Sequence, residues 1–520
     1  MSDAGPTVGT APEKGIDRSL YASATMIDPE AQEGNTDGTV WSDNVLYRWV
    51  QRFEKLAGAE ARGIERVPES LRSHKVALAD YVQMAIIWFS ANLTANNVLL
   101  GLLGPLVFDL GLNDCLLLGT FGGLVGAAAC GYISTFGPLS GNRTLVVARY
   151  TMGWWPSRIC VLLNIVIMLG YGLVDTLIAG QILSAVNGQG LTVIVGVIIA
   201  AIISLVICLF GMKLFHQYER YAFIPQLLVL FILIGVAGPK FDTSTVSTGN
   251  GPTRSADQMS FFFLCMSGPL AWTPASADFY VYFPPTASRW KVFMSSTLGN
   301  GLSTIITLLL GSGVASGVAG NPSWGAAYGV SEGALLTEVF APLGTFGHFC
   351  AVVIALGMIA NNVPGTYSAS LSFQLLGRWF QAIPRFFWTI VGVIIYTVCA
   401  CAGRDKLFSI FQNFLALMGY WTAMWVTLTL EEEFIFRKGL AGYDWKAWNQ
   451  AKKLPIGIAA FTAFCIGWVG AVLGMFQTYF TGPLAATVGD GIDLGIPVSI
   501  SWAALSYPPL RWLELRFLGR

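Results

Sequence analysis

Twelve long apolar runs occupy this chain from Met84 almost to its end, and no other feature restricts its fold as strongly. Each run has about the 17–25 residues that a helix needs to cross the hydrocarbon core of a bilayer. The predicted spans are 84–108, 115–137, 158–186, 191–210, 221–238, 259–283, 292–318, 346–376, 384–402, 407–430, 455–480 and 486–508. The sequence therefore predicts an all-α polytopic membrane protein with about 12 transmembrane helices.

The composition is that of a chain surrounded mainly by lipid. Hydrophobic residues make up 54% of the 520 residues and charged residues only 12%, about half the charged share of an ordinary soluble domain. The formal net charge is zero, so nucleic-acid binding is not expected. All nine cysteines lie in or at the ends of apolar runs, which is evidence against a disulfide framework. We expect neither a metal nor a cofactor.

The basic residues are distributed unevenly between the two sides of the predicted membrane. With the N-terminus in the cytosol, 17 of them fall in inside loops or the C-terminal tail, and nine fall in the N-terminal segment. Only Lys240, Arg254, Arg404 and Lys406 fall outside. Cytosolic loops of membrane proteins carry an excess of Lys and Arg. We therefore expect both termini to be cytosolic.

All but two of the 30 carboxylates lie in the N-terminal segment, in loops or at span ends. The exceptions are Asp175, near the middle of the third span, and Asp278, in the inner half of the sixth. A charged side chain at the bilayer centre costs about 2.5–3.5 kcal/mol on insertion scales, so it usually faces a cavity and marks an ion or substrate path. Both residues are therefore candidates for proton coupling. Alternatively, Asp175 forms a structural hydrogen bond between helices, and Asp278 caps a broken helix or pairs with Arg289.

Two spans contain polar or helix-breaking clusters. The first span holds Ser-Ala-Asn-Leu-Thr-Ala-Asn-Asn at 90–97, and the sixth holds Pro269 and Pro274, each of which removes a backbone donor. Irregular backbone at membrane depth is tolerated where it lines a cavity or is buried in protein. Interruptions five spans apart are typical of a five-plus-five inverted repeat, in which transporters bind substrate between the broken helices. The sequence thus predicts a transporter with broken helices 1 and 6.

These features divide the chain into five parts. Residues 1–83 form a cytosolic segment whose first part, to about residue 44, is expected to be disordered. An amphipathic helix is expected within 44–63, and it either lies on the membrane surface or packs against the cytosolic ends of the bundle. Residues 84–430 form the ten-helix inverted-repeat transport core. A cytosolic loop, two additional transmembrane helices and a cytosolic tail follow at 431–454, 455–508 and 509–520.

The eighth span carries two adjacent amides, Asn361 and Asn362, followed by Pro364. Each amide supplies donors and acceptors, and adjacent residues on a helix point about 100° apart. One Asn is therefore expected to line a binding site while the other bonds a neighbouring helix. The alternative is that both serve only to bond helices together.

Taken together, these stretches resemble the nucleobase–cation symporter family, in its fungal purine–cytosine permease branch. The matching stretches are Tyr47-Arg-Trp, Glu65-Arg-Val-Pro, the polar first span, Leu169-Gly-Tyr-Gly-Leu-Val-Asp175, Ala271-Trp-Thr, Ala277-Asp, Asn361-Asn-Val-Pro, Tyr367-Ser and Tyr507-Pro-Pro-Leu-Arg-Trp-Leu-Glu-Leu-Arg. The resemblance covers nearly the whole chain after about residue 40. It implies a LeuT-like fold with two helices outside the repeat, and proton-coupled import of cytosine, adenine, guanine and hypoxanthine at the plasma membrane.

The resemblance also implies a set of substrate-binding residues. They are Ser90, Asn92, Thr94, Tyr171, Asp175, Trp272, Asn361 and Asn362. In this scheme Trp272 stacks on the heterocycle, an eighth-span Asn bonds its edge, and the first-span residues close the site. The family carries Trp at the position of Tyr171 and an amide at that of Asp175. The carboxylate is therefore a departure that bears on the substrate range more than on the fold.

The side-chain chemistry at these positions suits a nucleobase. Stacking on an aromatic ring is worth about 1–3 kcal/mol per base, and amides or a carboxylate can read the donors and acceptors on its rim. The chain has no P-loop, and its three His lie in loops or at a span end, so ATP-driven transport and enzymatic catalysis are not expected. Three alternatives remain: the same fold carrying another small heterocycle such as a B6-type vitamin, coupling to Na⁺, or a nutrient receptor that does not transport.

Overall fold

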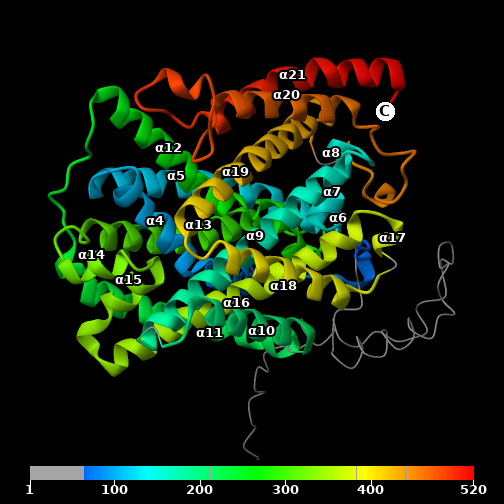
Figure 1. Ribbon diagram of the computed structural model, residues 1–520. Helices are drawn as coiled ribbons and strands as arrows, with labels where there is room; N and C mark the ends of the chain where they lie inside the picture. The colour runs from blue at the N-terminus through cyan, green and yellow to red at the C-terminus, as the bar shows by residue number, and fades with distance from the viewer. Residues whose placement is uncertain (1–63, 189, 211, 382, 440–441) are drawn as a thin grey trace, which may run out of the picture. The chain divides into compact units, whose positions relative to one another are not determined.

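The computed structural model describes residues 64–188, 190–210, 212–381, 383–439 and 442–520 (Figure 1). The predicted amphipathic helix at 44–63 lies outside these residues. The spans, in chain order, are α3 (Leu78–Asn92) with α4 (Ala95–Val107), α5 (Leu112–Ser134), α9 (Ser157–Val186), α10 (Val193–Phe210), α11 (Met212–Ala237), α12 (Gly251–Leu270) with the 3-10 helix η4 (Thr273–Tyr280), α13 (Arg289–Ser316), α16 (Thr345–Leu375), α18 (Arg385–Ala402), α19 (Leu407–Glu431), α20 (Ile458–Gly474) and α21 (Gly495–Leu518).

This order confirms the predicted fold class. Six of the described helices are long and apolar enough to cross a membrane, and the bent pair α3 and α4 gives a seventh. The shorter apolar helices α10 and α20 and the more polar α12, α19 and α21 agree with a total of about twelve spans. The connections contain η2 (Glu69–Leu71), α6 (Phe136–Ser140), α7 (Thr144–Val147), α8 (Arg149–Met152), α14 (Pro322–Tyr328), α15 (Glu332–Val339) and α17 (Arg378–Gln381).

The spans pack into two groups of four. α3 with α4, α5, α12 and α13 contact one another, and α9, α10, α16 and α18 do the same. In span numbers these groups are 1, 2, 6 and 7, and 3, 4, 8 and 9, so the members of each group pair at an offset of five. This is the correspondence that a five-plus-five repeat produces. Of the two halves of the first span, α4 contacts α9 and α16 of the second group.

Small residues allow the helices of the first group to approach closely. Gly101 on α4 and Gly311 on α13 leave no room for a Cβ, because the carbonyl groups of Leu308 and Val98 lie there. The Ser312 hydroxyl donates to the Gly101 carbonyl at 3.1 Å. Contacts between small residues stabilise helix pairs in lipid, where the hydrophobic effect does not drive helices together.

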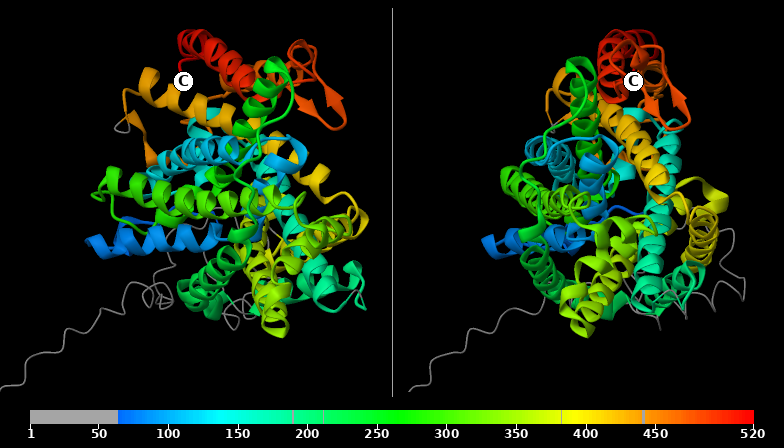
Figure 2. Two further views of the ribbon diagram at one scale, coloured as in Figure 1. Left: turned by 90° about the vertical axis from the view of Figure 1, so that its left-hand side faces the viewer. Right: turned by 60° about the vertical axis from the view of Figure 1, so that its left-hand side comes forward.

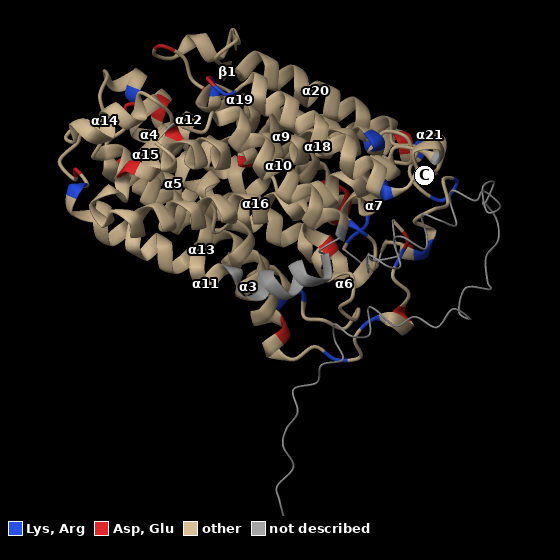
Figure 3. Cartoon of the chain, turned by 60° about the horizontal axis from the view of Figure 1, so that its bottom comes forward, with Lys and Arg blue, Asp and Glu red and all other residues tan. Residues whose placement is uncertain are grey.

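Rows of large apolar side chains stay exposed on the outer faces of the spans. On α5 they include Leu117, Phe121 and Val125, which are four residues apart and therefore share one face. Soluble monomers rarely expose contiguous apolar surface of this kind, so these faces contact lipid. Figure 3 shows the charged residues gathered toward the ends of the spans, with an almost uncharged band between them.

Arginines from distant parts of the chain gather at one end of the spans, which we call the basic end. They are Arg72, Arg143, Arg289, Arg437 and Arg511. Glu432 is fully buried there, in a π-helical turn (Glu432–Phe436), and accepts from Arg437 at 2.9 Å and from Arg511 at 3.0 Å. The tyrosine hydroxyl of Tyr507 donates to the same carboxylate at 2.7 Å.

The opposite end carries a loop at 475–494, and we call it the hairpin end. Strands β1 (Phe476–Gln477) and β2 (Phe480–Thr481) pair there as a short antiparallel hairpin. The loop is tied to the spans by Asp493, whose backbone N–H donates to Ser260 on α12 at 2.8 Å. Figure 2 shows α20 and α21 (orange and red) side by side at the edge of the molecule, against α19.

The predicted bounds of the last two spans were wrong. α20 ends at Gly474 rather than at 480, and α21 covers Gly495–Leu518 rather than 486–508. Glycines with positive φ at 489 and 491 break the apolar run, because such backbone favours glycine and is not helical. Most of the predicted tail at 509–520 is helical instead, since Arg511 and Glu514 find buried partners at Glu432 and at the backbone N–H of Gly457.

Candidate functional site

The first span breaks between Asn92 and Ala95, where α3 and α4 meet at 57°. Polar side chains bond the backbone that the break exposes. The Asn97 amide donates to the Asn92 carbonyl at 2.8 Å, and the Asn92 amide donates to the Trp88 carbonyl at 3.1 Å. The predicted site residues Asn92 and Thr94 are therefore buried at the break itself, whereas Ser90, one half-turn earlier, is half-buried.

Asp175 forms the centre of a cluster that joins three spans. Its side chain is 1% exposed. The Asn361 amide of α16 donates to Oδ2 at 3.1 Å, and the Asn96 amide of α4 donates to Oδ1. We call these three residues the carboxylate–amide cluster. It lies where α4 meets α9 and α16, at the contact between the two groups of spans.

Both amides of the cluster leave an oxygen without a partner. Oδ1 of Asn96 and Oδ1 of Asn361 are buried and accept no hydrogen bond from any residue that the structure describes. A buried acceptor left unpaired costs about 1–3 kcal/mol. The two oxygens can therefore take an N–H or O–H donor of a ligand at a gain in free energy, while the carboxylate fixes their orientation.

Aromatic rings lie beside this cluster. Tyr171, one helical turn before Asp175, stacks on Trp272 with ring centroids 6.4 Å apart and planes inclined by 19°. The Tyr171 hydroxyl donates to the Gly268 carbonyl at 3.4 Å, at the break of the sixth span. Trp88 meets Trp272 edge-on, at 6.1 Å and 86°. The three rings therefore meet near the breaks of the first and sixth spans.

Asn362 does not belong to the cluster. Its amide donates to the Tyr396 hydroxyl on α18 at 3.0 Å and to the Ser204 hydroxyl on α10 at 3.3 Å. Its Oδ1 accepts from Thr366 at 3.2 Å. Every polar atom of this side chain therefore bonds another part of the second group, as the 100° step from Asn361 requires.

Asp278 lies at the basic end instead. Its Oδ1 accepts from the backbone N–H of Thr144 at 2.6 Å and from the Thr144 hydroxyl at 2.8 Å, and Oδ2 accepts from Arg143 at 3.4 Å. The alternative pairing with Arg289 is wrong, because Arg289 forms its ion pair with Glu433 at 2.9 Å. The structure does not bring Asp278 to the carboxylate–amide cluster, and its contacts are those of a residue that holds α7 against η4.

Sequence reasoning missed Asn96 and Trp88. Asn96 lies in the polar stretch at 90–97 that was singled out, but Ser90, Asn92 and Thr94 were assigned to the site instead. The polar stretch marked the region but not the residue, because Asn96 reaches α9 only through the direction that α4 takes after the break. Trp88 gave no signal, because one Trp in an apolar run is ordinary. Among the described residues, no group of three or more His, Cys, Asp or Glu side chains could hold a metal ion.

Comparison with known proteins places this arrangement in a family. The family described as "Permease for cytosine/purines, uracil, thiamine, allantoin" matches residues 67–495, which include both broken spans and the cluster. The chain belongs to this family. Its members are permeases and not enzymes.

Fungal relatives match over almost the whole chain. The purine-cytosine permease fcyB of Emericella nidulans is 32% identical over 496 residues, which cover 94% of this chain and 96% of the relative. The vitamin B6 transporter TPN1 of Saccharomyces cerevisiae is also 32% identical, over 524 residues that cover 91% and 90%. The resemblance to the purine–cytosine permease branch is thus confirmed.

A solved transporter shares the fold. The inward-facing conformation of Mhp1 superposes with a TM-score of 0.66 at 15% identity and covers 88% of this chain and 96% of Mhp1. Mhp1 with bromovinylhydantoin bound, described as a nucleobase-cation-symport-1 family transporter, gives 0.64 at 14% identity, with 87% and 95% covered. The LeuT-like inverted repeat is therefore confirmed. As a member of the permease family, the chain is a membrane transporter.

Proposed function

We propose that this permease imports nucleobases such as cytosine, adenine, guanine and hypoxanthine across the plasma membrane, together with a proton. The observation that carries the proposal is the carboxylate–amide cluster beside the stacked pair Tyr171 and Trp272. A nucleobase presents two flat faces and a rim of donors and acceptors, and the site offers rings for the faces and amide oxygens for the rim.

Recognition in this proposal separates into stacking and reading of the rim. Trp272 and Tyr171 stack on the two faces at about 1–3 kcal/mol per base, with little discrimination between bases. Asn96 and Asn361 accept rim N–H groups, in the way that polar side chains read base edges elsewhere. The first-span residues Ser90, Asn92 and Thr94 close the site by holding the break, and Asn362 supports the helix that carries Asn361.

Proton coupling is assigned to Asp175. An ionised carboxylate only accepts hydrogen bonds, so it keeps the NH₂ groups of Asn96 and Asn361 turned toward it. A protonated carboxyl donates one hydrogen bond. An amide oxygen accepts that bond when one of the two Asn side chains turns its oxygen toward Asp175. Proton uptake at Asp175 therefore changes which amide atom faces the ligand, and this couples the proton to the base.

The orientation of the chain in the membrane is proposed from its charges, and its location from its relatives. The basic end, with Arg143, Arg289 and Arg437, is proposed to face the cytosol because cytosolic loops are rich in basic residues. The hairpin end then faces outward, and both termini are cytosolic. The fungal purine-cytosine permeases that this chain resembles favour the plasma membrane as its location.

The test is uptake in a yeast strain that lacks its own permeases. Radiolabelled cytosine is competed with adenine, guanine, hypoxanthine and pyridoxine, at several pH values and with external Na⁺ replaced by choline. We expect uptake that increases as external pH falls, is insensitive to Na⁺, and is competed by the bases. Trp272→Ala, compared with Trp290→Ala at an exposed position, should raise KM for all substrates by roughly 5- to 150-fold, the equivalent of one lost stacking contact.

A second candidate function is transport of a B6-type vitamin. The vitamin B6 transporter of Saccharomyces cerevisiae is as similar to this chain as the purine-cytosine permease is. Pyridoxine is also a flat ring with rim hydroxyls, which the free amide oxygens of the cluster can accept. Uptake of pyridoxine without uptake of any base would establish this alternative, and Na⁺-dependent uptake at fixed pH would replace the proton as coupling ion. Specific binding without uptake of any of these compounds would indicate a receptor.

A further inference from the structure

Exposed tryptophans gather at the basic end of the molecule. Among the described residues, five Trp side chains are at least 37% exposed, and Trp502 lies within the length of α21. The other four lie where a span meets the basic end: Trp155, Trp290, Trp379 and Trp512. Tryptophan is enriched at the level of the lipid headgroups, where its ring is partly in contact with water. The basic end therefore carries the side chains of an interface with headgroups.

Two arginines at this end each lie against one of two consecutive tryptophans. The Arg158 guanidinium lies 4.0 Å from the centre of the Trp155 ring, and the Arg149 guanidinium lies 4.5 Å from that of Trp154. Arg437 bonds the backbone directly after Arg149, which places the group at the basic end. A cation over an indole face is held there by the charge distribution of the ring. We call Arg149, Trp154, Trp155 and Arg158 the Trp–Arg corner.

The two positive charges of the corner have no carboxylate partner. Among the described residues, no Asp or Glu forms an ion pair with Arg149 or Arg158. Arg149 is 8% exposed and donates to the Trp448 carbonyl at 3.1 Å. Burial and the nearby charge of Arg158 lower the pKa of Arg149 to about 10. Because like charges disfavour each other's charged form, an anion beside the two guanidinium groups stabilises both.

Other arginines of the basic end have acidic partners within the protein. Arg289 pairs with Glu433 at 2.9 Å, and Arg511 pairs with Glu432 at 3.0 Å. Both carboxylates are fully buried, where a charge without a partner is costly. Arg158 is only half-buried and lies against the exposed ring of Trp155. Its missing partner can therefore come from outside the protein.

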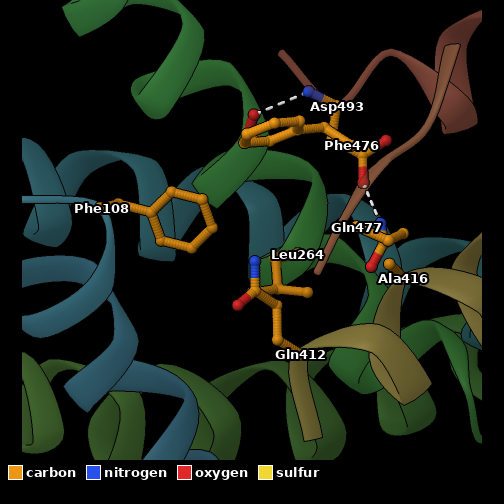
Figure 4. Close-up of a pocket in the computed structure, with 8 residues that line it drawn as sticks. Phe108, Leu264, Gln412, Ala416, Phe476, Gln477 and Asp493 are labelled. Carbon is orange, nitrogen blue, oxygen red and sulfur yellow. Dashed lines mark hydrogen bonds between the residues drawn. The ribbon is translucent and has the colours of Figure 1, made fainter. Parts of the chain in front are cut away.

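The hairpin end differs in this respect. Arg254 and Arg404 each pair with an Asp, at 3.0 and 3.6 Å. Figure 4 shows Asp493 of the hairpin loop bonded to Ser260 and to Gln477, beside a cavity that has room for about one water molecule. The arginines of the hairpin end are thus matched within the protein, and the cavity there is too small for an organic ligand.

The face of α9 that continues from Arg158 is apolar and exposed. Leu162 and Val166 are 52% and 54% exposed. They follow Arg158 at intervals of four residues, so the three side chains share one face. Val166 lies about 12 Å along the helix from Arg158, at 1.5 Å per residue. A cation at the end of a span with apolar side chains beyond it matches a phospholipid, which has a phosphate at one end and acyl chains at the other.

We propose that the Trp–Arg corner binds the phosphate of an anionic phospholipid, whose acyl chains lie along Leu162 and Val166. Arg158 contacts the headgroup, and Arg149 contributes a second positive charge beside it. The ligand lies on the outer face of α9, so binding needs no internal cavity. In the proposed orientation this end faces the cytosolic leaflet, which carries the anionic lipids. The inference goes beyond the proposed function, because it does not depend on the compound that the permease carries.

The experiment counts lipid molecules on the purified full chain. The protein in detergent is titrated with phosphatidylserine or with phosphatidylcholine of the same acyl chains, and bound lipid is measured by native mass spectrometry. Arg158→Gln removes the charge, and Arg158→Lys keeps it. Arg404→Gln is the matched control, because Arg404 is 42% exposed at the hairpin end. Binding is measured without transport, so a failure of the proposed function leaves this test unaffected.

We expect the unmodified protein to bind phosphatidylserine at least fivefold more tightly than phosphatidylcholine. Arg158→Gln should weaken phosphatidylserine binding about fivefold, the equivalent of one basic residue near an anionic surface, and leave phosphatidylcholine binding unchanged. Arg158→Lys should keep most of the preference, and Arg404→Gln all of it. Equal affinities for the two lipids, or an unchanged preference in Arg158→Gln, would show the inference to be wrong.

Inorganic phosphate separates a lipid from a soluble anion. An excess of it should leave phosphatidylserine bound, because it offers no acyl chain to Leu162 and Val166. Displacement of the lipid by phosphate would mean that the corner binds a soluble anion, and the inference would fail.

A second variant decides the question if Arg158→Gln cannot be purified. Trp155 lies before the first residue of α9 and is 66% exposed, so Trp155→Ala should fold normally. It should weaken phosphatidylserine binding by about two- to fivefold, since it removes the ring that holds Arg158. Trp502→Ala, at an exposed position within α21, should have no effect. An unchanged lipid preference in Trp155→Ala overturns the inference.

Discussion

Nδ2 of Asn361 lies 3.1 Å from Oδ2 of Asp175, so the eighth span donates a hydrogen bond to the carboxylate of the third, deep between the two groups of helices. The neighbouring Asn362 points away and bonds Ser204 and Tyr396. Two adjacent residues of one type thus have different partners, which allows recognition and folding to be separated by substitution.

The first prediction concerns these two amides. Asn361→Ala should weaken transport unequally among bases, by roughly 5- to 150-fold in KM for those that donate to its oxygen, because one polar partner worth about 1–3 kcal/mol is lost. Asn362→Ala should instead lower surface delivery for all substrates alike, since Ser204 and Tyr396 lose their partner. KM for cytosine, adenine and hypoxanthine, normalised to surface protein, tests both. Equal and unselective losses in the two variants would mean that neither amide reads the substrate.

The second prediction concerns Asp175. Asp175→Asn keeps the size of the side chain and an acceptor oxygen but cannot bind or release a proton. The variant should retain base binding, while its uptake should no longer vary between external pH 5 and pH 8. Asp278→Asn is the comparison, and it should reduce surface delivery because Thr144 and Arg143 lose the carboxylate, with the pH profile of the remaining uptake unchanged. A wild-type pH profile in Asp175→Asn would place the proton elsewhere.

The sequence was sufficient for the parts of the structure that follow from local physics. Apolar runs of bilayer length located the spans, and Pro269 with the polar stretch at 90–97 located both breaks. It was insufficient where partners are distant in the chain. The pairing of Asp278 with Thr144 spans 134 residues, and no periodicity encodes it.

Two further differences have the same origin. Glu432 and Glu433 were assigned to a cytosolic loop but are fully buried, because Arg511 and Arg289 reach them from other helices. Asn96 was passed over because its direction depends on the 57° bend between α3 and α4, which a helical wheel drawn through the whole span does not contain. The apolar residues of the hairpin loop were assigned to the last two predicted spans, although they lie between the helices.

The third prediction tests orientation. Epitope tags placed before residue 1 and after residue 520 should both be cytosolic, since the basic residues concentrate on one side. In intact cells an external protease should leave both tags in place, and permeabilisation should make both accessible. A tag inserted at Gly344, in a loop of the hairpin side with φ of +57° and free space around it, should be removed from outside. Loss of either terminal tag from intact cells would contradict the orientation.

The fourth prediction concerns the buried ion pair at the basic end. Arg511 bonds Glu432 through two nitrogens at 3.0 and 3.1 Å, and both side chains are at most 4% exposed. Removing one partner of such a pair leaves a buried charge and costs about 3–5 kcal/mol. Glu432→Gln and Arg511→Met should each lower the thermal stability and the surface level strongly, and the double variant should recover part of the loss.

An exposed pair serves as its control. Arg404 and Asp405 lie 3.6 Å apart with side chains 42% and 78% exposed, and surface pairs contribute about 0–1 kcal/mol. Arg404→Ala should therefore leave the melting temperature almost unchanged. If the double variant is no more stable than the worse of the two single variants, Glu432 and Arg511 do not act as a pair.

The last prediction is a pH dependence of stability that originates in Asp493. Burial in the hairpin loop raises the pKa of this carboxyl to about 6, although hydrogen bonds from Tyr420, Gln477 and the backbone of Gly495 act in the opposite direction. In an unfolded chain an Asp has a pKa of about 3.9. As pH falls from 7 toward 4, the folded state binds this proton before the unfolded state does, so Asp493 adds stability over that window and nothing further below it.

The contribution should be on the order of 2–3 kcal/mol between pH 7 and pH 4, at 1.36 kcal/mol for each unit of pKa difference. Thermal unfolding of the purified protein in detergent, followed by tryptophan fluorescence from pH 4 to pH 8, measures it. Asp493→Asn cannot titrate, so its stability should rise less on acidification than that of the unmodified protein. Asp490→Asn, at an exposed position of the same loop, should keep the original profile. If the curves of Asp493→Asn and of the unmodified protein are parallel over this range, Asp493 is ionised in the folded state throughout, and the burial of the hairpin loop does not control its proton.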